Sequence, residues 1–205
     1  MQLFYAPGAC SLGIHVLLEE IGAPYEAVPV ALREGAQFKP PFTTINPKSK
    51  VPVLTLGNGS VLTEYPAIAY YLAATHPTAG LLPPAGEPMA RALEAADYCV
   101  STVHMQAFSR VFRPDKFAPT ATDHDAVKAQ GQSMFDAGLA RLDAALAGQD
   151  WIVGDYSFAD SAIFYICFWR AGRMKQDLPP NVAAHYARML ARPAVQRAMA
   201  QEGLV

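Results

Sequence analysis

The fold is decided by residues 1–22, MQLFYAPGACSLGIHVLLEEIG. The run Gln2–Tyr5 predicts a short strand, and a Pro-Gly pair ends it. From Cys10 onward, apolar residues recur at the spacing of one helical face, namely Ile14, Leu17, Leu18 and Ile21. Gly22 ends this helix, and a proline follows shortly after it. The stretch therefore predicts a strand, a turn that carries a cysteine, and a helix.

The predicted turn places the Cys10 thiol at a helix N-terminus, where free backbone N–H groups and the helix dipole favour negative charge. This environment predicts a lowered thiol pKa and a site receptive to anions. Lowering that pKa from about 8.5 to about 6.5 takes roughly 2.7 kcal/mol, and the dipole supplies ~2 kcal/mol at most. Hydrogen bonds from Ser11 or backbone N–H groups must therefore add the rest. The alternative is that Cys10 is an ordinary small buried residue.

The composition is that of a globular chain. Of its 205 residues, 52% are apolar and 17% are charged, and the net charge is −2. Lys and Arg form no cluster, so we expect neither nucleic acid nor a membrane as a partner. The chain has no apolar run long enough to cross a bilayer and no evident signal peptide, so we expect a cytoplasmic protein.

The three cysteines are sparse and odd in number, which favours a reducing compartment over a disulfide framework. Cys99 and Cys167 lie in apolar helical stretches and are expected in the core. No Cys/His spacing typical of a metal site is present, so no metal is expected.

Three further strands are expected in the first half of the chain. Tyr25–Val30 forms a βαβ unit with the first strand, so these two strands should be parallel. Residues Ala31–Asn46 read as irregular, with room for one short helix. Val53–Leu56 and Ser60–Leu62 flank a Gly-Asn-Gly turn, which predicts an antiparallel hairpin.

Two positions around this hairpin suggest a ligand site. A cis bond before Pro52 would turn the N–H and C=O of Val51 outward, free to pair with an extended peptide-like ligand. Thr63 is the expected N-cap of the next helix. Glu64 then lies in the first turn, where its carboxylate either complements the helix dipole or waits for the ammonium group of a ligand.

The remainder of the chain reads as helical. The Pro- and Gly-rich linker 78–88 separates a first domain, 1–77, from an all-helical domain, 89–205. The expected long helices are Met89–Phe112 and Ala126–Leu146. Ser157 and Asp160 form a capping box before an apolar run, which should be the central helix of its domain. Prolines mark the starts of two shorter final helices.

Four motifs together resemble the cytosolic glutathione S-transferases over essentially the whole chain. FYAPGACSLGIH resembles the opening of the bacterial beta class, and INPKSKVPVL resembles the segment with the family's cis-proline. TEYPAIAYYL resembles the segment that binds the γ-glutamyl group, and SFADSAIFY resembles the family's capping box. The resemblance implies a thioredoxin-like α/β domain, an all-α second domain, a homodimer, and glutathione as co-substrate without a metal.

The resemblance also implies roles for individual residues. Cys10 would approach the glutathione sulfur, with Ser11 as a second catalytic residue and Ala9 in the same turn. Val51, which precedes Pro52, would pair its backbone with the cysteinyl part. The remaining glutathione-binding residues would be Glu64 and the Tyr65 N–H, at the γ-glutamyl end, and His104.

Two positions depart from the family pattern. Tyr65 stands where serine or glycine is usual, so its ring must point away and only its N–H can serve. The beta class carries His-Lys in a stretch like STELHKxF, whereas this chain reads STVHMQAF. His104 therefore falls one residue early, about 100° around an α-helix. It either reaches the site or is a histidine satisfied within a helix interface.

The sequence thus predicts a transferase that joins the glutathione thiolate to small hydrophobic electrophiles. Cys10 has two possible roles, because it either hydrogen-bonds the bound thiolate or forms a mixed disulfide and gives glutathione-dependent reductase activity. A glutathione-dependent isomerase or dehalogenase, and a non-catalytic binding or regulatory protein, are the alternatives. Phe108, Phe112 and Phe117 either line the electrophile pocket or belong to the core.

Overall fold

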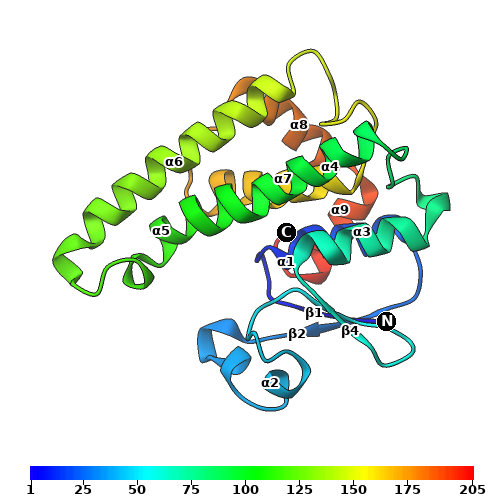
Figure 1. Ribbon diagram of the computed structural model, residues 1–205, viewed down its shortest axis with the longest axis horizontal. Helices are drawn as coiled ribbons and strands as arrows, with labels where there is room; N and C mark the ends of the chain where they lie inside the picture. The colour runs from blue at the N-terminus through cyan, green and yellow to red at the C-terminus, as the bar shows by residue number, and fades with distance from the viewer.

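The computed structural model describes residues 1–205, and its N-terminal part holds a four-stranded sheet in the order β2-β1-β3-β4 (Figure 1). The strands are β1 (Gln2–Tyr5), β2 (Glu26–Pro29), β3 (Val53–Thr55) and β4 (Val61–Thr63). The first two are parallel, with Leu3 opposite Ala27. The pairs β1–β3 and β3–β4 are antiparallel. The predicted βαβ unit and the predicted hairpin are confirmed.

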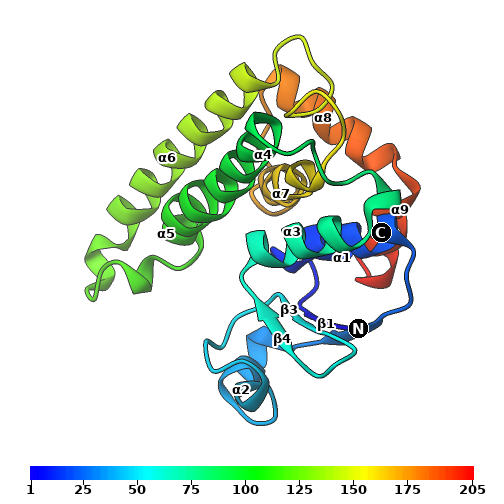
Figure 2. The same ribbon diagram turned by 45° about the vertical axis from the view of Figure 1, so that its right-hand side comes forward.

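Two helices cover one face of the sheet, α1 (Ser11–Ile21) and α3 (Tyr65–Thr75), and α2 (Phe42–Ile45) lies on the other (Figure 2). Helix α1 begins after Cys10 and ends at Gly22, whose φ of 69° is left-handed, as predicted. The segment predicted to hold one short helix contains three helical turns instead: η1 (Leu32–Glu34), η2 (Ala36–Phe38) and α2.

The predicted cap of α3 is wrong. Thr63 is the last residue of β4, and Glu64 occupies the N-cap position with a φ of 70°. A positive φ is rare for a residue with a side chain and costs about 1–3 kcal/mol, so the surrounding structure must hold it in place.

The helical part begins with one continuous helix made of α4 (Glu87–Asp97), η4 (Tyr98–Phe108) and α5 (Ser109–Phe112). The sequence predicted a single α-helix from Met89, but η4 is π-helical, with i→i+5 bonds. The later elements are α6 (His124–Ala145), α7 (Phe158–Phe168) with a π-helical end η7 (Trp169–Arg173), α8 (Pro180–Ala191) and α9 (Pro193–Gln201). No helix is long and apolar enough to span a membrane.

Helix α7 is the centre of the molecule. Figure 2 shows it nearly end-on, with α4 and α8 on either side and α1 and α3 below. The predicted capping box is present, because Asp160 accepts from the Ser157 N–H at 2.9 Å and Ser157 Oγ accepts from the Ala159 N–H at 3.3 Å. Cys167 lies on α7 and Cys99 on η4, and both are fully buried, as predicted.

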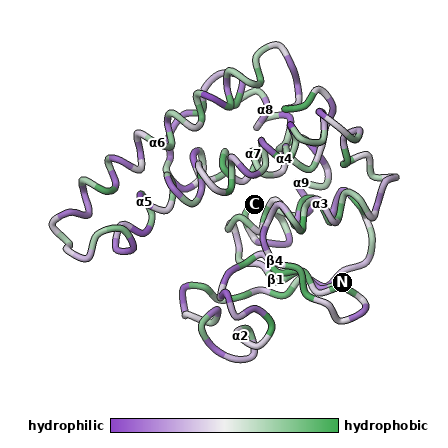
Figure 3. Tube along the Cα trace, in the orientation of Figure 1, coloured by the Kyte–Doolittle hydropathy of each residue, from purple (hydrophilic) through white to green (hydrophobic).

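The amphipathic helix α6 covers the outside of this bundle, and hydrophilic and hydrophobic residues alternate along it in Figure 3. Four apolar residues at helical spacing along α6 and its C-terminal end are buried: Phe135, Leu139, Leu142 and Leu146. The proline-rich connection is anchored by Leu81, which is fully buried and accepts a hydrogen bond from the Phe158 N–H at the start of α7. The largest apolar cluster draws on both parts of the chain, so they share one core.

Candidate functional site

Cys10 stands at the N-terminus of α1, as predicted, and its side chain does not cap the helix. Its Sγ lies 3.4 Å from the Val51 carbonyl oxygen, to which the thiol donates. Two residues that the resemblance assigned to glutathione are therefore in direct contact. Ala9 belongs to the same turn, and its N–H donates to the Ala6 carbonyl at 2.9 Å.

The expectation of a lowered Cys10 pKa is wrong. Burial raises the pKa of the Cys10 thiol to about 12, which outweighs the backbone N–H groups of Ser11 and Cys10 and the charge of Lys50 that favour the thiolate. The charge of Glu202 raises the pKa further. At neutral pH, Cys10 is therefore a thiol and a hydrogen-bond donor.

The Ser11 hydroxyl does not reach the sulfur. It is fully buried, accepts from the Ala6 N–H at 3.1 Å and faces the Ala6 carbonyl at 3.4 Å. The expected support from Ser11 comes from its backbone N–H rather than from its side chain. A catalytic role for Ser11 stays a prediction.

The Val51–Pro52 peptide bond is cis, as hypothesised. The Val51 N–H donates to no carbonyl or side chain of the protein, and its carbonyl accepts only the Cys10 thiol. One backbone donor and one weakly occupied acceptor therefore lie beside Cys10. This is the peptide edge that the sequence predicted.

Glu64 is not an unpaired acid. Its Oε1 lies 2.8 Å from Lys48 Nζ, which also donates to Thr63 Oγ1 at 2.9 Å. Both charged side chains are more than half exposed, at 59% and 54%. Such surface pairs contribute about 0–1 kcal/mol, so a ligand ammonium can displace Lys48 at little cost.

The ring of Tyr65 points away from the surface, as predicted, and is buried between α1 and α7. Its hydroxyl lies 2.7 Å from Ser161 Oγ, and Ser161 donates to the Phe158 carbonyl at 2.7 Å, so Tyr65 is the donor. A side chain at position 13 would clash here, since a Cβ on Gly13 would lie 2.2 Å from the Tyr65 hydroxyl. Glycine at position 13 therefore makes room for the unusual tyrosine.

His104 lies on the π-helical segment η4 inside an aromatic cluster. Its ring centroid is 4.6 Å from that of Trp169 and 5.9 Å from that of Tyr165. Burial, with a contribution from the charge of Lys50, lowers the pKa of His104 to about 4. Its Nδ1 is buried and has no hydrogen-bond partner. His104 is therefore neutral and lies in a helix interface, and Lys50 acts on both His104 and Cys10.

Known proteins are similar to this chain over its whole length. Residues 8–75 match the model of the glutathione S-transferase N-terminal domain, and residues 100–193 match that of the C-terminal domain. The chain is 35% identical to the glutathione S-transferase GstA of Escherichia coli O157:H7, and the alignment covers 100% of both chains. The chain belongs to the glutathione S-transferase family.

Solved structures extend this result. A Sulfitobacter glutathione transferase homologue with bound glutathione has a TM-score of 0.91 at 30% identity, over 100% of this chain and 98% of the other. A bacterial beta class glutathione S-transferase from Sphingomonas chungbukensis has a TM-score of 0.86 at 35% identity, over 100% of both chains. The predicted fold, a thioredoxin-like domain followed by an all-α region, is confirmed, and the protein is an enzyme of the transferase class.

In this glutathione S-transferase, side chains of the helical part hold the turn before Cys10. The Gly8 N–H donates to Glu202 at 2.7 Å, and Trp169 Nε1 and Arg173 Nη2 each donate to the Gly8 carbonyl at 2.8 Å. Glu202 also binds the buried His15 at 2.9 Å. Sequence reasoning missed these residues, and the only signal was the Pro-Gly pair, where Gly8 has a φ of 64°.

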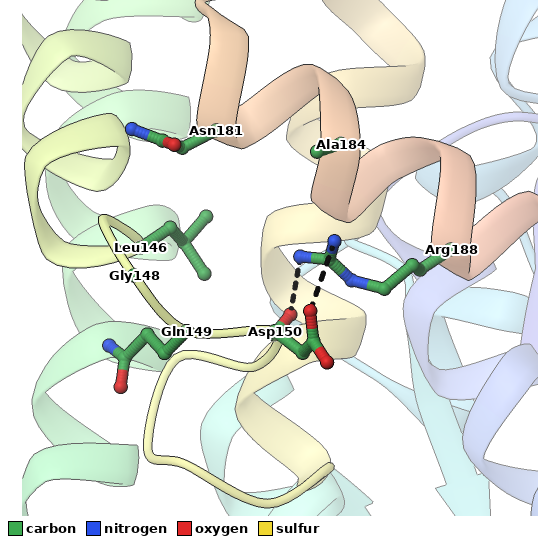
Figure 4. A pocket seen from close by; sticks show the side chains of 7 residues that line it. All are labelled: Leu146, Gly148, Gln149, Asp150, Asn181, Ala184 and Arg188. Atoms are coloured by element: carbon green, nitrogen blue, oxygen red, sulfur yellow. Dashed lines mark hydrogen bonds and ion pairs between the residues drawn. The ribbon is translucent and has the colours of Figure 1, made fainter.

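Two surface pockets of this glutathione S-transferase lie away from these residues. The first, about 300 Å³, is lined by α6, α8 and the loop between α6 and α7, and an Arg188–Asp150 pair closes one side (Figure 4). The second, about 350 Å³, is lined by residues around Gly22, Tyr25 and Gln201. Neither contains a predicted site residue. No group of three or more His, Cys, Asp or Glu side chains converges on a metal position.

Proposed function

We propose that this enzyme binds glutathione along the Val51 edge and transfers its thiolate to small hydrophobic electrophiles. The observation that carries the proposal is the Cys10 Sγ–Val51 O contact of 3.4 Å. It brings a sulfur-directed donor, a helix N-terminus and an open peptide edge to one point. Glutathione is a tripeptide whose reactive atom is a sulfur, and these three features match its backbone and its thiolate.

Cys10 acts as a donor rather than as a nucleophile. Because burial raises its pKa to about 12, the thiol keeps its proton at neutral pH. When glutathione binds, the S–H group turns from the Val51 carbonyl to the glutathione sulfur. The backbone N–H groups of Ser11 and Cys10 already favour negative charge at the Cys10 sulfur. In this proposal they extend the same stabilisation to the glutathione thiolate, with their orientation fixed before the reaction begins.

The other predicted residues hold the tripeptide. Val51 pairs with its cysteinyl backbone, and the cis bond before Pro52 keeps that edge open. Glu64 exchanges Lys48 for the γ-glutamyl ammonium, while the Tyr65 N–H binds the carboxylate beside it. His104, neutral and without a partner at Nδ1, packs against Trp169, the residue that holds the Gly8 carbonyl, and is kept as a glutathione-binding residue in this proposal. In the transfer, the glutathione thiol gives its proton to water, its sulfur bonds to the electrophilic carbon, and the leaving group departs with its electron pair.

Conjugation of chlorodinitrobenzene by wild type and by Cys10→Ala tests this assignment. We expect Cys10→Ala to bind glutathione in calorimetry and to lower kcat/KM by about 10-fold, the low end for a hydrogen bond to a charged group, since S–H is a weak donor. The pH at which the bound thiol ionises should rise. Glutathione binding without turnover on a broad electrophile panel would favour a non-catalytic protein.

The same enzyme is proposed to be a cytoplasmic homodimer with a role in detoxification. Its three cysteines are unpaired, which suits a reducing compartment. Three apolar side chains of α3, α4 and β4 are exposed although they are large: Tyr70, Leu93 and Val61. A second copy of the chain would cover them. Light scattering should give twice the chain mass, and Leu93→Glu should shift the protein toward the monomer.

A further inference from the structure

An aromatic wall leads from the Gly8 turn to the surface of the molecule. Trp169, whose Nε1 holds the Gly8 carbonyl, stacks on Phe108 with centroids 4.1 Å apart and an angle of 21°. Phe108 stacks in turn on Phe112, at 5.4 Å and 13°. Phe108 is buried, whereas Phe112 is 56% exposed. The wall therefore ends in a large apolar ring that the protein itself does not cover.

An unpaired cation lies beside that ring. The Arg173 guanidinium carbon is 5.8 Å from the Phe112 centroid. One of its nitrogens, Nη2, donates to the carbonyls of Gly8 and Pro7. Its other nitrogens have no acceptor in the protein, and no carboxylate forms an ion pair with it.

The neighbouring charges do not neutralise Arg173. Arg33, from the segment before α2, lowers the pKa of Arg173 in addition to the larger effect of partial burial. The charge of Glu202 raises the pKa of Arg173, but the Glu202 carboxylate already accepts from the Gly8 N–H and binds His15. Arg113, next to Phe112 in the chain, shows the contrast, because it is paired with Asp115 through two bonds of 2.9 and 3.0 Å.

We propose that Arg173 and Phe112 form a subsite that selects aromatic electrophiles bearing a carboxylate. This inference rests on the proposed transferase function. The ring of the substrate lies against Phe112, and its carboxylate binds the free nitrogens of Arg173, a planar fork that suits two carboxylate oxygens. Because Arg173 also holds the turn before Cys10, a substrate bound there is close to the sulfur that attacks it.

The reaction that follows is a nucleophilic aromatic substitution. The glutathione sulfur forms a bond to the ring carbon that carries the leaving halide. The carbon–halogen bond breaks, and the halide departs with the bonding electrons. The proton of the glutathione thiol goes to water, and the carboxylate remains unchanged throughout. No oxidant or reductant is required.

A matched pair of substrates tests the subsite: chlorodinitrobenzoate and its neutral methyl ester. Each rate is divided by the uncatalysed rate with glutathione, which removes the difference in ring reactivity. We expect wild type to prefer the acid by at least about 10-fold in kcat/KM, as one charge-assisted hydrogen bond provides. The glutathione conjugates of the acid and of the ester should show the same difference, about 10-fold, in their dissociation constants. Calorimetry measures these constants without turnover.

Four variants separate two roles of Arg173: the charge that binds the carboxylate, and the hydrogen bonds to the Pro7 and Gly8 carbonyls. Arg173→Met should abolish the preference for the acid, and Arg173→Lys should keep most of it. Trp169→Phe removes another donor to the same Gly8 carbonyl and should lower both rates alike. Arg113→Met, at the paired arginine, should leave the preference intact.

The outcomes distinguish the subsite from the function on which it rests. Equal use of acid and ester by wild type, or an undiminished preference in Arg173→Met, overturns the subsite while the transferase function stands. Tighter, Arg173-dependent binding of the acid conjugate without turnover of either compound overturns the transferase function and leaves the subsite.

Discussion

The N-termini of α1 and α7 differ in whether a side chain caps their free backbone N–H groups. Both helices begin with backbone N–H groups that lack partners within the helix. At α7, Ser157 and Asp160 satisfy them reciprocally, and Asp160 also binds the Ile152 N–H at 3.1 Å and His185 at 2.9 Å. At α1, Cys10 provides no cap, and its thiol turns to the Val51 carbonyl. The helix start in the core is closed by its own side chains, whereas the start at which we propose that glutathione binds has no side-chain cap.

The largest expected effect comes from breaking the closed start. Asp160 is fully buried and accepts from Ser157, from the Ile152 N–H and from His185. Asp160→Ala leaves these donors buried without an acceptor, which should lower the free energy of unfolding by about 3–5 kcal/mol. Urea denaturation followed by circular dichroism measures this loss.

Two comparisons make the result specific to the network. Asp97→Ala, at an exposed position on α4, should change stability by less than about 0.5 kcal/mol. Ser157→Ala removes only the cap and should cost about 1 kcal/mol. An Asp160→Ala protein as stable as the Asp97→Ala protein would show that the buried carboxylate does not hold the start of α7.

A second test concerns the contact between the first turn of α1 and the first turn of α7. A Cβ on Gly13, in the first turn of α1, would lie 2.2 Å from the Tyr65 hydroxyl and 2.7 Å from the carbonyl of Ser161, in the first turn of α7. Gly13→Ala should therefore cost about 1–3 kcal/mol through overpacking, although alanine is the better helix former.

Gly57→Ala is the matched control, since a Cβ there meets nothing within 4 Å. Adding Tyr65→Phe to Gly13→Ala removes the closest contact and should restore part of the lost stability. If Gly13→Ala melts at the wild-type temperature, the contact between the two starts is looser than the geometry indicates.

Local patterns predicted much of this fold. The βαβ unit, the hairpin and the Ser157–Asp160 capping box each depend on residues close in the chain. The π-helical η4 was not predicted, because propensity and apolar spacing do not distinguish i→i+5 from i→i+4 bonding, and η4 packs on α6 and α7, which are distant in the chain. The raised pKa of Cys10 was not predicted either. The helix dipole follows from the local sequence, whereas the burial of Cys10 depends on tertiary packing.

The site divides in the same way. Val51, Pro52 and Glu64 were proposed from short motifs around the hairpin, and of these features the cis bond before Pro52 is confirmed. The partner of Glu64 was missed, because Lys48 approaches it only when β4 folds back. Arg173 and Glu202 were missed entirely, since nothing near them in sequence shows that they reach Gly8.

The effect that is smallest at neutral pH concerns two buried histidines, His185 and His104. At α7, His185 has a carboxylate partner, whereas His104, which packs on the Trp169 that holds the Gly8 turn, has none at Nδ1. Burial lowers the pKa of His104 to about 4, below the value of about 6.5 expected in the unfolded chain. Between these values the unfolded chain binds more protons than the folded one, so stability falls as the pH drops from 6.5 toward 4. The slope for one such group is at most about 1.4 kcal/mol per pH unit.

His104→Phe, which cannot titrate, should lose stability less steeply over this pH window, as measured by urea denaturation. Above pH 7 the curves of stability against pH should be parallel for wild type and variant. If the two curves are parallel from pH 7 down to pH 4, protonation of His104 costs the folded protein nothing. The imidazolium must then have a hydrogen-bond acceptor in the folded protein.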